Sequence, residues 1–166
     1  MSEELPKSAR RVQQALLAAG ITARIVELPQ STRTAADAAA AIGCGVEQIA
    51  KSLVFRCAGS DLPVLVIASG INRVDERLVS SHLDADIAKA DADFVRAATG
   101  FAIGGVPPLG HVAPLRTLID EDLLKLDTIW AAAGTPHAVF SLAPQQLIRV
   151  TGGHVVPVAK PQAQAT

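Results

Sequence analysis

The sequence predicts a single α+β domain with a curled, mixed but mostly antiparallel sheet, partly barrel-like, flanked by helices. Its 166 residues are enough for one domain with a real core. Hydrophobic residues make up 49% of the chain and charged residues 19%, which is typical of a folded protein. The expected strands come in pairs with helices between them, and this order favours a mixed sheet over strict βαβ repeats. We expect residues 1–158 to form the domain and residues 159–166 to be a flexible tail.

An apolar repeat predicts the first helix. Apolar side chains follow the i, i+3, i+4, i+7 spacing from Val12 to Ala19, and Gly20 ends the pattern. Residues 7–19 are therefore expected to form an amphipathic helix. Residues 22–28 follow as the first predicted strand.

Capping and turn chemistry predict the next elements. Thr34, with Asp37 three residues later, resembles a capping box at the start of a helix. Residues 58–61 (Ala-Gly-Ser-Asp) have turn composition, so the apolar runs on either side are expected to pair as a hairpin. The elements expected here are a helix through Ile42, a short helix at 46–50, and strands at 52–57 and 63–68.

Three polar residues predict helix starts in the rest of the chain. Asp75 and Asp91 are expected to open helices that run to Ser81 and Ala98. Ser141 is expected to cap a last helix that continues to Ile148. The remaining expected elements are strands at 116–119, 128–132, 137–140 and 154–158, and a short helix at 120–124.

The most informative segment is the loop Gly100–His111, in which four glycines and two adjacent prolines accompany four apolar residues. Glycine permits close approach of a ligand to the backbone, and proline stiffens the chain. One interpretation is a rigid platform whose N–H groups hold a carbonyl or a phosphate. The other is a stiff connection between two core strands. We expect His111 to cap this loop and not to ligate a metal.

Two charged or titratable residues also attract attention. Lys51 lies at the start of an otherwise apolar strand, where a charge is costly unless it has a partner. It could present a compact charge to a phosphate or carboxylate, or it could be an edge lysine whose ammonium reaches solvent. His137 follows the turn Gly134–Pro136 at the entrance to a strand, where a half-exposed structural role is the alternative.

Composition excludes several classes of function. With 15 basic and 16 acidic residues, the chain lacks the strongly basic surface of a non-specific nucleic-acid binder. Aromatic residues are 3% of the chain, which disfavours a base-stacking platform. The scattered histidines and the two cysteines have no metal-site spacing, so we expect no metal. No apolar run reaches membrane-spanning length and the start is acidic, so we expect a cytoplasmic protein.

Four segments in order resemble the YbaK/EbsC family, the free-standing relatives of the editing domain inserted in bacterial prolyl-tRNA synthetases. They are Ser31–Thr34, Gln48–Phe55, Gly104–His111 and Ala133–His137, and the resemblance spans residues 7 to 158. It implies a trans-editing deacylase that hydrolyses the ester between a wrong amino acid and tRNA. It implies tRNA-Pro as the natural partner and no cofactor. The amino acid stays open among alanine, cysteine, serine, threonine and small non-protein amino acids.

The resemblance also implies roles for individual residues. Lys51 matches the lysine on which activity depends, through the 3′ end of the tRNA. The Gly-x-x-x-Pro loop matches Gly104 to Pro108, with the backbone of Gly104 and Gly105 holding the aminoacyl carbonyl. A hydroxyl of the terminal ribose is expected to orient the attacking water. The residues expected to bind the substrate are Val106, Pro107, Pro108, His137, Gly134 and Thr34, with His137 shaping the amino-acid pocket.

Two other functions remain as alternatives at this stage. The first is a non-catalytic tRNA- or synthetase-binding module with the same fold. The second is a hydrolase of another small ester or amide that uses Cys44, which lies in a Gly-Cys-Gly turn. We expect a monomer or weak dimer, with prolyl-tRNA synthetase as a candidate partner.

Overall fold

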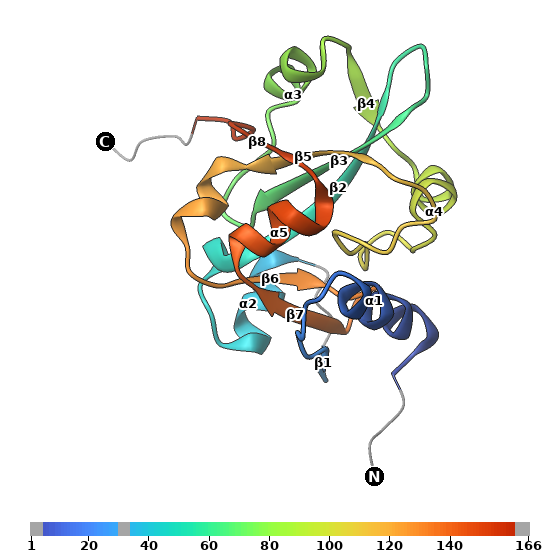
Figure 1. Cartoon of the computed structure of the whole chain (residues 1–166). Coiled ribbons are helices and arrows are strands. Elements are labelled where there is room, and N and C mark those ends of the chain that lie inside the picture. Colours follow the sequence, from blue (N-terminus) through green and yellow to red (C-terminus); the bar gives the residue numbers. More distant parts are fainter. Residues whose placement is uncertain (1–4, 30–33, 162–166) are drawn as a thin grey trace.

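The computed structural model describes residues 5–29 and 34–161, which form one sheet of eight strands with five α-helices and two 3-10 helices (Figure 1). The helices are α1 (Lys7–Ala18), α2 (Ala35–Ile42), η1 (Val46–Gln48), α3 (Glu76–Leu83), α4 (Ala92–Thr99), η2 (Glu121–Lys125) and α5 (Pro144–Thr151). The strands are β1 (Val26–Glu27), β2 (Ile49–Cys57), β3 (Pro63–Ser69), β4 (Ile87–Lys89), β5 (Arg116–Asp120), β6 (Ile129–Ala132), β7 (Ala138–Leu142) and β8 (His154–Val156). None of the helices in the described ranges is long and apolar enough to cross a membrane.

The sheet is mixed, as the sequence predicts. Its order is β1-β7-β6-β2-β3-β5-β8, and β4 pairs with β2 beside this path. Four strand pairs are antiparallel (β1–β7, β7–β6, β2–β3 and β2–β4) and three are parallel (β6–β2, β3–β5 and β5–β8). The order ends at β1 and β8, which do not pair with each other in the described structure. The sheet is therefore open, without the partly barrel-like closure that we expected.

Strand β2 has an unusual outer edge. On one side it pairs with β3 from Ala50 to Arg56. On the other side, β6 pairs only with its first two residues and β4 only with Phe55–Cys57. Residues 51–54 consequently have no described strand beside them on that edge. This interruption positions the candidate site.

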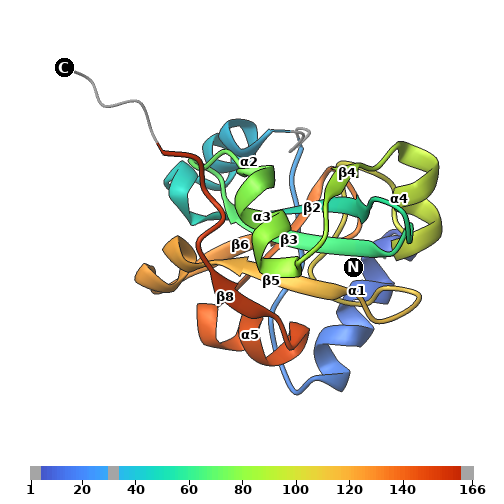
Figure 2. The same ribbon diagram turned by 90° about the horizontal axis from the view of Figure 1, so that it is seen from above.

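The core lies on both faces of the sheet. Helices α1 and α5 cover one face through residues such as Leu16 and Leu147, and they lie together on one side of the strands in Figure 2. Helix α3 covers part of the other face through Val79 and Leu83. Helix α2 packs against the start of β2 and against β6, in a small cluster that includes Ile49 and Trp130.

Local sequence signals predicted the helix starts well. The Asp75 and Asp91 carboxylates accept backbone N–H groups at the starts of α3 and α4, and Thr34 Oγ1 accepts the N–H of Asp37. Hairpin β2–β3 is also confirmed. In each case the signal lies within a few residues of the element it defines.

Two predicted features were wrong, and one strand was missed. Ser141 does not cap a helix, because β7 continues to Leu142 and pairs Ser141 with Trp130; α5 begins at Pro144, a favourable first helical residue. The predicted strand 22–28 shrinks to β1, whose ladder with β7 covers two residue pairs. Strand β4 was missed, because it depends on the free edge of β2 and not on its own short sequence.

The end of the described chain contacts the domain. Ala159 forms an isolated bridge with Val74, and the Lys160 N–H donates to the Arg73 carbonyl at 2.8 Å. Residues 162–166 of the expected tail lie outside the described residues.

Candidate functional site

A groove runs along the interrupted edge of β2. Two cavities, of about 540 Å³ and about 370 Å³, lie next to each other and share part of their lining. The residues shared by both cavities are Lys51, Ser52, Leu53, Ile103, Gly104 and Val106. The groove therefore lies between the start of β2 and the Gly/Pro loop.

The two ends of the groove differ in chemistry. The larger cavity, here called the apolar chamber, is lined by Thr34, Ala35, Ala38, Ile49, Ala50, Trp130, Ala131, Ala132 and Val139 in addition to the shared wall. The smaller cavity, here called the basic chamber, adds the cations Arg73, Lys89 and Lys160 and one acid, Glu76. With Lys51, four cations line the basic chamber. The groove can thus hold a molecule that is apolar at one end and anionic at the other.

Lys51 lies where the two chambers meet. It is half-buried and pairs with Ala68 of β3, and its ammonium forms no ion pair with a described residue. Burial lowers the pKa of Lys51 below its usual value; the Asp120 carboxylate opposes this shift, and the Arg73 guanidinium adds to it. A partly desolvated ammonium without an ion-pair partner is suited to bind an anionic or strongly polar ligand.

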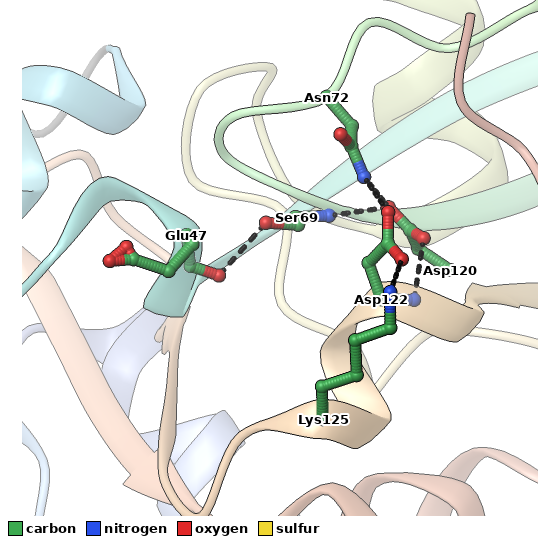
Figure 3. A network of polar contacts seen from close by, with 6 residues as sticks. All are labelled: Glu47, Ser69, Asn72, Asp120, Asp122 and Lys125. Atoms are coloured by element: carbon green, nitrogen blue, oxygen red, sulfur yellow. Dashed lines mark hydrogen bonds and ion pairs between the residues drawn. The ribbon is translucent and has the colours of Figure 1, made fainter. Parts of the chain in front are cut away.

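A buried carboxylate, that of Asp120, ties several strand ends together (Figure 3). Asp120 is fully buried, and its Oδ2 accepts the Ser69 N–H at 3.0 Å and the Asn72 side-chain amide at 2.7 Å. The Ser69 hydroxyl in turn donates to the Glu47 carbonyl at 2.8 Å, in η1 immediately before β2. These bonds tie β5, β3 and the start of β2 together, so the backbone that carries Lys51 is held firmly.

The Gly/Pro loop presents a turn to the groove. The Gly105 N–H donates to the Ala102 carbonyl at 3.1 Å, and Gly104 has a φ of +93°. A positive φ at the third position is the type II pattern, which favours glycine there. The N–H of Gly104 is not used by this turn and has no hydrogen bond among the described residues. The Gly105 N–H is already engaged, so Gly104 is the available donor of the two that we expected.

His111 holds the loop in place, as the sequence predicts. Its Nε2–H donates to the Pro107 carbonyl at 2.7 Å, and its ring lies edge-on to Phe101 with centroids 6.4 Å apart. The Arg11 guanidinium, on α1, lies 4.8 Å from the centroid of the Phe101 ring, so α1 also contacts Phe101. Burial lowers the pKa of His111, the bond to Pro107 opposes this shift, and Arg11 adds to it.

The structure brings together some of the predicted site residues. Lys51, Gly104 and Val106 line both chambers, and Thr34 lines the apolar chamber. Ser31, Thr32 and Arg33, which carry part of the family resemblance, lie outside the described residues.

Other predicted site residues support the loop without lining either chamber. Pro107 and Pro108 are buried residues of the loop itself. A Cβ on Gly134 would lie 2.7 Å from the Ser8 carbonyl oxygen, so this turn packs directly on α1. Gly105 packs on the next residue of the same turn, Thr135.

His137 is not brought to the groove. Its side chain is exposed, and it lines neither chamber. Its backbone N–H bonds to Thr135 Oγ1, and its carbonyl accepts the Leu28 N–H. Its expected role in shaping the amino-acid pocket therefore has no support from its position.

Sequence reasoning missed most of the basic chamber and the polar group at the junction. Lys89 lies on a strand that was not predicted, and Lys160 lies in the expected tail. Arg73 carries no local pattern that separates it from a solvated surface charge. Ser52 is next to Lys51 in the sequence, but only the pairing of β2 shows that it faces the junction.

Cys44 does not lie in the groove. Burial raises the pKa of its thiol and Glu47 raises it further, which disfavours the thiolate that a nucleophile needs. Cys57 is buried in the strand. No group of three or more potential metal ligands (His, Cys, Asp or Glu) occurs among the residues that the structure describes.

Comparison with known proteins agrees with this geometry. Residues 29–150 match the model of the aminoacyl-tRNA editing domain family. The uncharacterized protein YwhH of Bacillus subtilis (strain 168) is 30% identical over 123 residues, which cover 74% of this chain and 78% of that protein.

Solved structures show the same likeness. A crystal structure described as a "putative trans-editing enzyme for prolyl tRNA synthetase" matches with a TM-score of 0.90 and 45% identity, over 95% of this chain and 100% of that chain. The hypothetical protein APE2540 matches with a TM-score of 0.84 and 27% identity, over 90% and 99% of the two chains. The family match confirms the resemblance drawn from the four sequence segments. The chain belongs to the family of aminoacyl-tRNA editing domains.

Proposed function

We propose that this protein is a trans-editing deacylase that hydrolyses the ester of mischarged tRNA, with tRNA-Pro carrying a small wrong amino acid as the first candidate. The observation that carries the proposal is the groove with an apolar and a basic end, joined at Lys51 and Gly104. An aminoacylated tRNA end has the same polarity, because an amino-acid side chain and an anionic phosphate lie on either side of the ester.

This polarity fixes the orientation of the substrate. The amino-acid side chain enters the apolar chamber, whose lining includes five alanines. The terminal phosphate enters the basic chamber, near Lys51, Arg73 and Lys160. Exposed cations bind phosphate modestly and in a salt-dependent way, which suits a brief encounter with tRNA.

The chemistry requires a positioned ester more than a strong nucleophile. The Gly104 N–H donates to the ester carbonyl and stabilises the oxyanion that forms when water attacks the carbonyl carbon. The bond between that carbon and the ribose oxygen then breaks, and the proton from water ends on the ribose oxygen. The products are the free amino acid and uncharged tRNA. As the family resemblance implies, a ribose hydroxyl of the tRNA orients the water.

Cellular setting follows from this proposal. A protein that edits aminoacyl-tRNA acts where translation occurs, so we place it in the cytoplasm. It acts on aminoacyl-tRNA as a monomer or weak dimer, with prolyl-tRNA synthetase as a candidate partner.

The test is release of amino acid from a panel of tRNA-Pro species charged with different small amino acids. We expect the wild-type protein to release one or two of them. Lys51→Ala should lower kcat/KM at least about a hundredfold, equivalent to ~2.7 kcal/mol of transition-state stabilisation. Lys51→Arg should not restore activity, because a planar guanidinium does not fit where a compact charge is needed.

Lys7→Ala is the matched control. It removes the same charge from the exposed start of α1 and should leave kcat/KM unchanged. Binding of tRNA without release of any amino acid would refute the deacylase and favour a non-catalytic binding module.

A further inference from the structure

Ser52 directs its backbone into the junction between the two chambers. The Gly70 N–H donates to the Ile49 carbonyl on the β3 side, at 2.7 Å. The Cys57 N–H donates to the Leu62 carbonyl on the same side, at 2.8 Å. Since alternate residues of a strand bond to opposite edges, the N–H and C=O of Ser52 point toward the opposite, interrupted edge. Neither β6 nor β4 pairs with Ser52 there.

The Ser52 side chain lacks a partner as well. Its Oγ is buried and has no hydrogen bond, and it is the one such side-chain atom found in the described part of the protein. A buried hydroxyl without a partner destabilises the folded protein, and native structures usually avoid it. Ser52 lines both chambers, so its unpartnered hydroxyl lies immediately behind the surface that a bound ligand would contact.

The position of Ser52 indicates which part of a bound aminoacyl ester it would contact. If the ester carbonyl is held by Gly104 and the side chain enters the apolar chamber, the α-carbon lies at the junction. The α-amino group is the polar substituent on that carbon. It donates hydrogen bonds, and Ser52 offers two acceptors, Oγ and the backbone carbonyl.

We propose that Ser52 recognises the α-amino group of the bound aminoacyl ester through its hydroxyl and its edge-facing carbonyl. This inference rests on the proposed function for the orientation of the ligand. It makes Ser52 a specificity-determining residue, which distinguishes an amino acid from an acyl group of the same shape.

Binding of two stable analogues tests this proposal without turnover. One is 3′-amino-3′-deoxyadenosine whose 3′ nitrogen is acylated with alanine. The other is acylated with propionic acid at the same nitrogen and so lacks only the α-amino group. Wild-type protein should bind the alanyl analogue at least tenfold more tightly than the propionyl analogue. Ser52→Ala should bind the alanyl analogue more weakly and the propionyl analogue as the wild type does, so that its preference falls well below tenfold, because only the backbone carbonyl is left to accept from the α-amino group.

Thermal stability separates this role from a structural one. Ser52→Ala loses no hydrogen bond in the free protein, so its Tm should equal or exceed that of the wild type. Ser69→Ala is the matched control, because its hydroxyl donates to the Glu47 carbonyl, and it should lower the Tm. A fall in Tm for Ser52→Ala as large as that of the control would overturn the proposal.

Two binding results would also overturn it. They are equal affinity of the wild type for the two analogues, and a Ser52→Ala protein that still prefers the alanyl analogue tenfold. If Ser52 proves to recognise the α-amino group while no amino acid is released from charged tRNA, the deacylase proposal fails and this inference stands. If an amino acid is released from charged tRNA but the wild type does not discriminate between the two analogues, the deacylase proposal stands and this inference fails.

Discussion

The backbone of Gly105 lies directly against the backbone of Thr135. A Cβ atom on Gly105 would come within 2.8 Å of the Thr135 Cα and within 2.9 Å of its N and C atoms. Two segments that are thirty residues apart in sequence are thus held together without intervening side chains. The contact sets the height of the Gly/Pro loop above the groove, and Gly105 is required there for space and not for an unusual φ.

Replacing Gly105 by alanine should therefore damage both stability and activity. The new methyl group meets backbone atoms, which cannot move aside as a flexible side chain can. We expect a loss of about 1–3 kcal/mol in the free energy of unfolding, which is the usual cost of overpacking. Deacylation should fall as well, because the loop that carries Gly104 is displaced. Urea denaturation and single-turnover kinetics measure the two effects.

Gly153→Ala is a useful control for this variant. The three atoms nearest to a Cβ at Gly153 are side-chain atoms of Ile119 and Thr117, at 3.0–3.1 Å, and the site is outside the groove. It should change stability less than Gly105→Ala and leave deacylation intact. A Gly105→Ala protein with wild-type stability and activity would show that the loop does not depend on this contact.

Gly104 is needed for its backbone conformation. Gly104 and Gly59 have φ values of +93° and +90°, and a Cβ on either would meet no atom within 4 Å. Alanine at each position should cost about 1–2 kcal/mol of stability from the left-handed conformation alone. Only Gly104→Ala should also lower kcat/KM, because it disturbs the turn that presents the free N–H. Equal activities for the two variants would show that deacylation does not depend on the left-handed conformation of Gly104 in this turn.

Much of the fold could be predicted from sequence because its signals are local. Asp75 and Asp91 cap helices that begin one residue later. Lys51 could be found because a charge inside an apolar strand is costly and so needs a reason. The Gly/Pro loop could be found because few other purposes require so many conformationally special residues in one segment.

The remaining features depend on contacts between distant segments. Strand β4 exists because β2 offers it a free edge, and the basic chamber forms only when Arg73, Lys89 and Lys160 are brought beside Lys51. Ser52 became a candidate only from the structure, because along one edge of β2 the pairing with β6 ends before Ser52 and the pairing with β4 begins after it. His137 shows the opposite case, since its motif predicted a pocket residue and its side chain is exposed.

The stability of the protein should depend on His111 in mildly acidic solution. The pKa of His111 is lower in the folded state than its ordinary value of 6.5, because its burial disfavours the charged ring. The unfolded chain then binds more protons, so stability falls as the pH drops through 6.5 toward the folded-state pKa. Above pH 7 this contribution is constant. Urea unfolding of the wild type and of His111→Gln between pH 5 and 8 measures it.

The difference in stability between the wild type and His111→Gln isolates the contribution of His111 from that of the other titrating groups. His111→Gln can keep a donor to the Pro107 carbonyl but does not titrate, so its stability should fall less on acidification. If the free energies of unfolding of the wild type and His111→Gln change in parallel between pH 5 and 8, the lowered pKa of His111 is contradicted.

The apolar chamber should select amino acids by size. Ala132, at the end of β6, lines this chamber, and valine there adds two methyl groups to the wall while remaining favourable in a strand. One methylene in such a pocket changes specificity by about 1–3 kcal/mol, or roughly 10–200-fold. Ala132→Val should therefore reject the larger of the accepted amino acids and retain alanine if alanine is a substrate. Ala88→Val makes the same change in β4, outside both chambers, and should leave the order of kcat/KM values unchanged. If both variants keep the wild-type order across the charged tRNA panel, the side chain of the substrate does not occupy the apolar chamber.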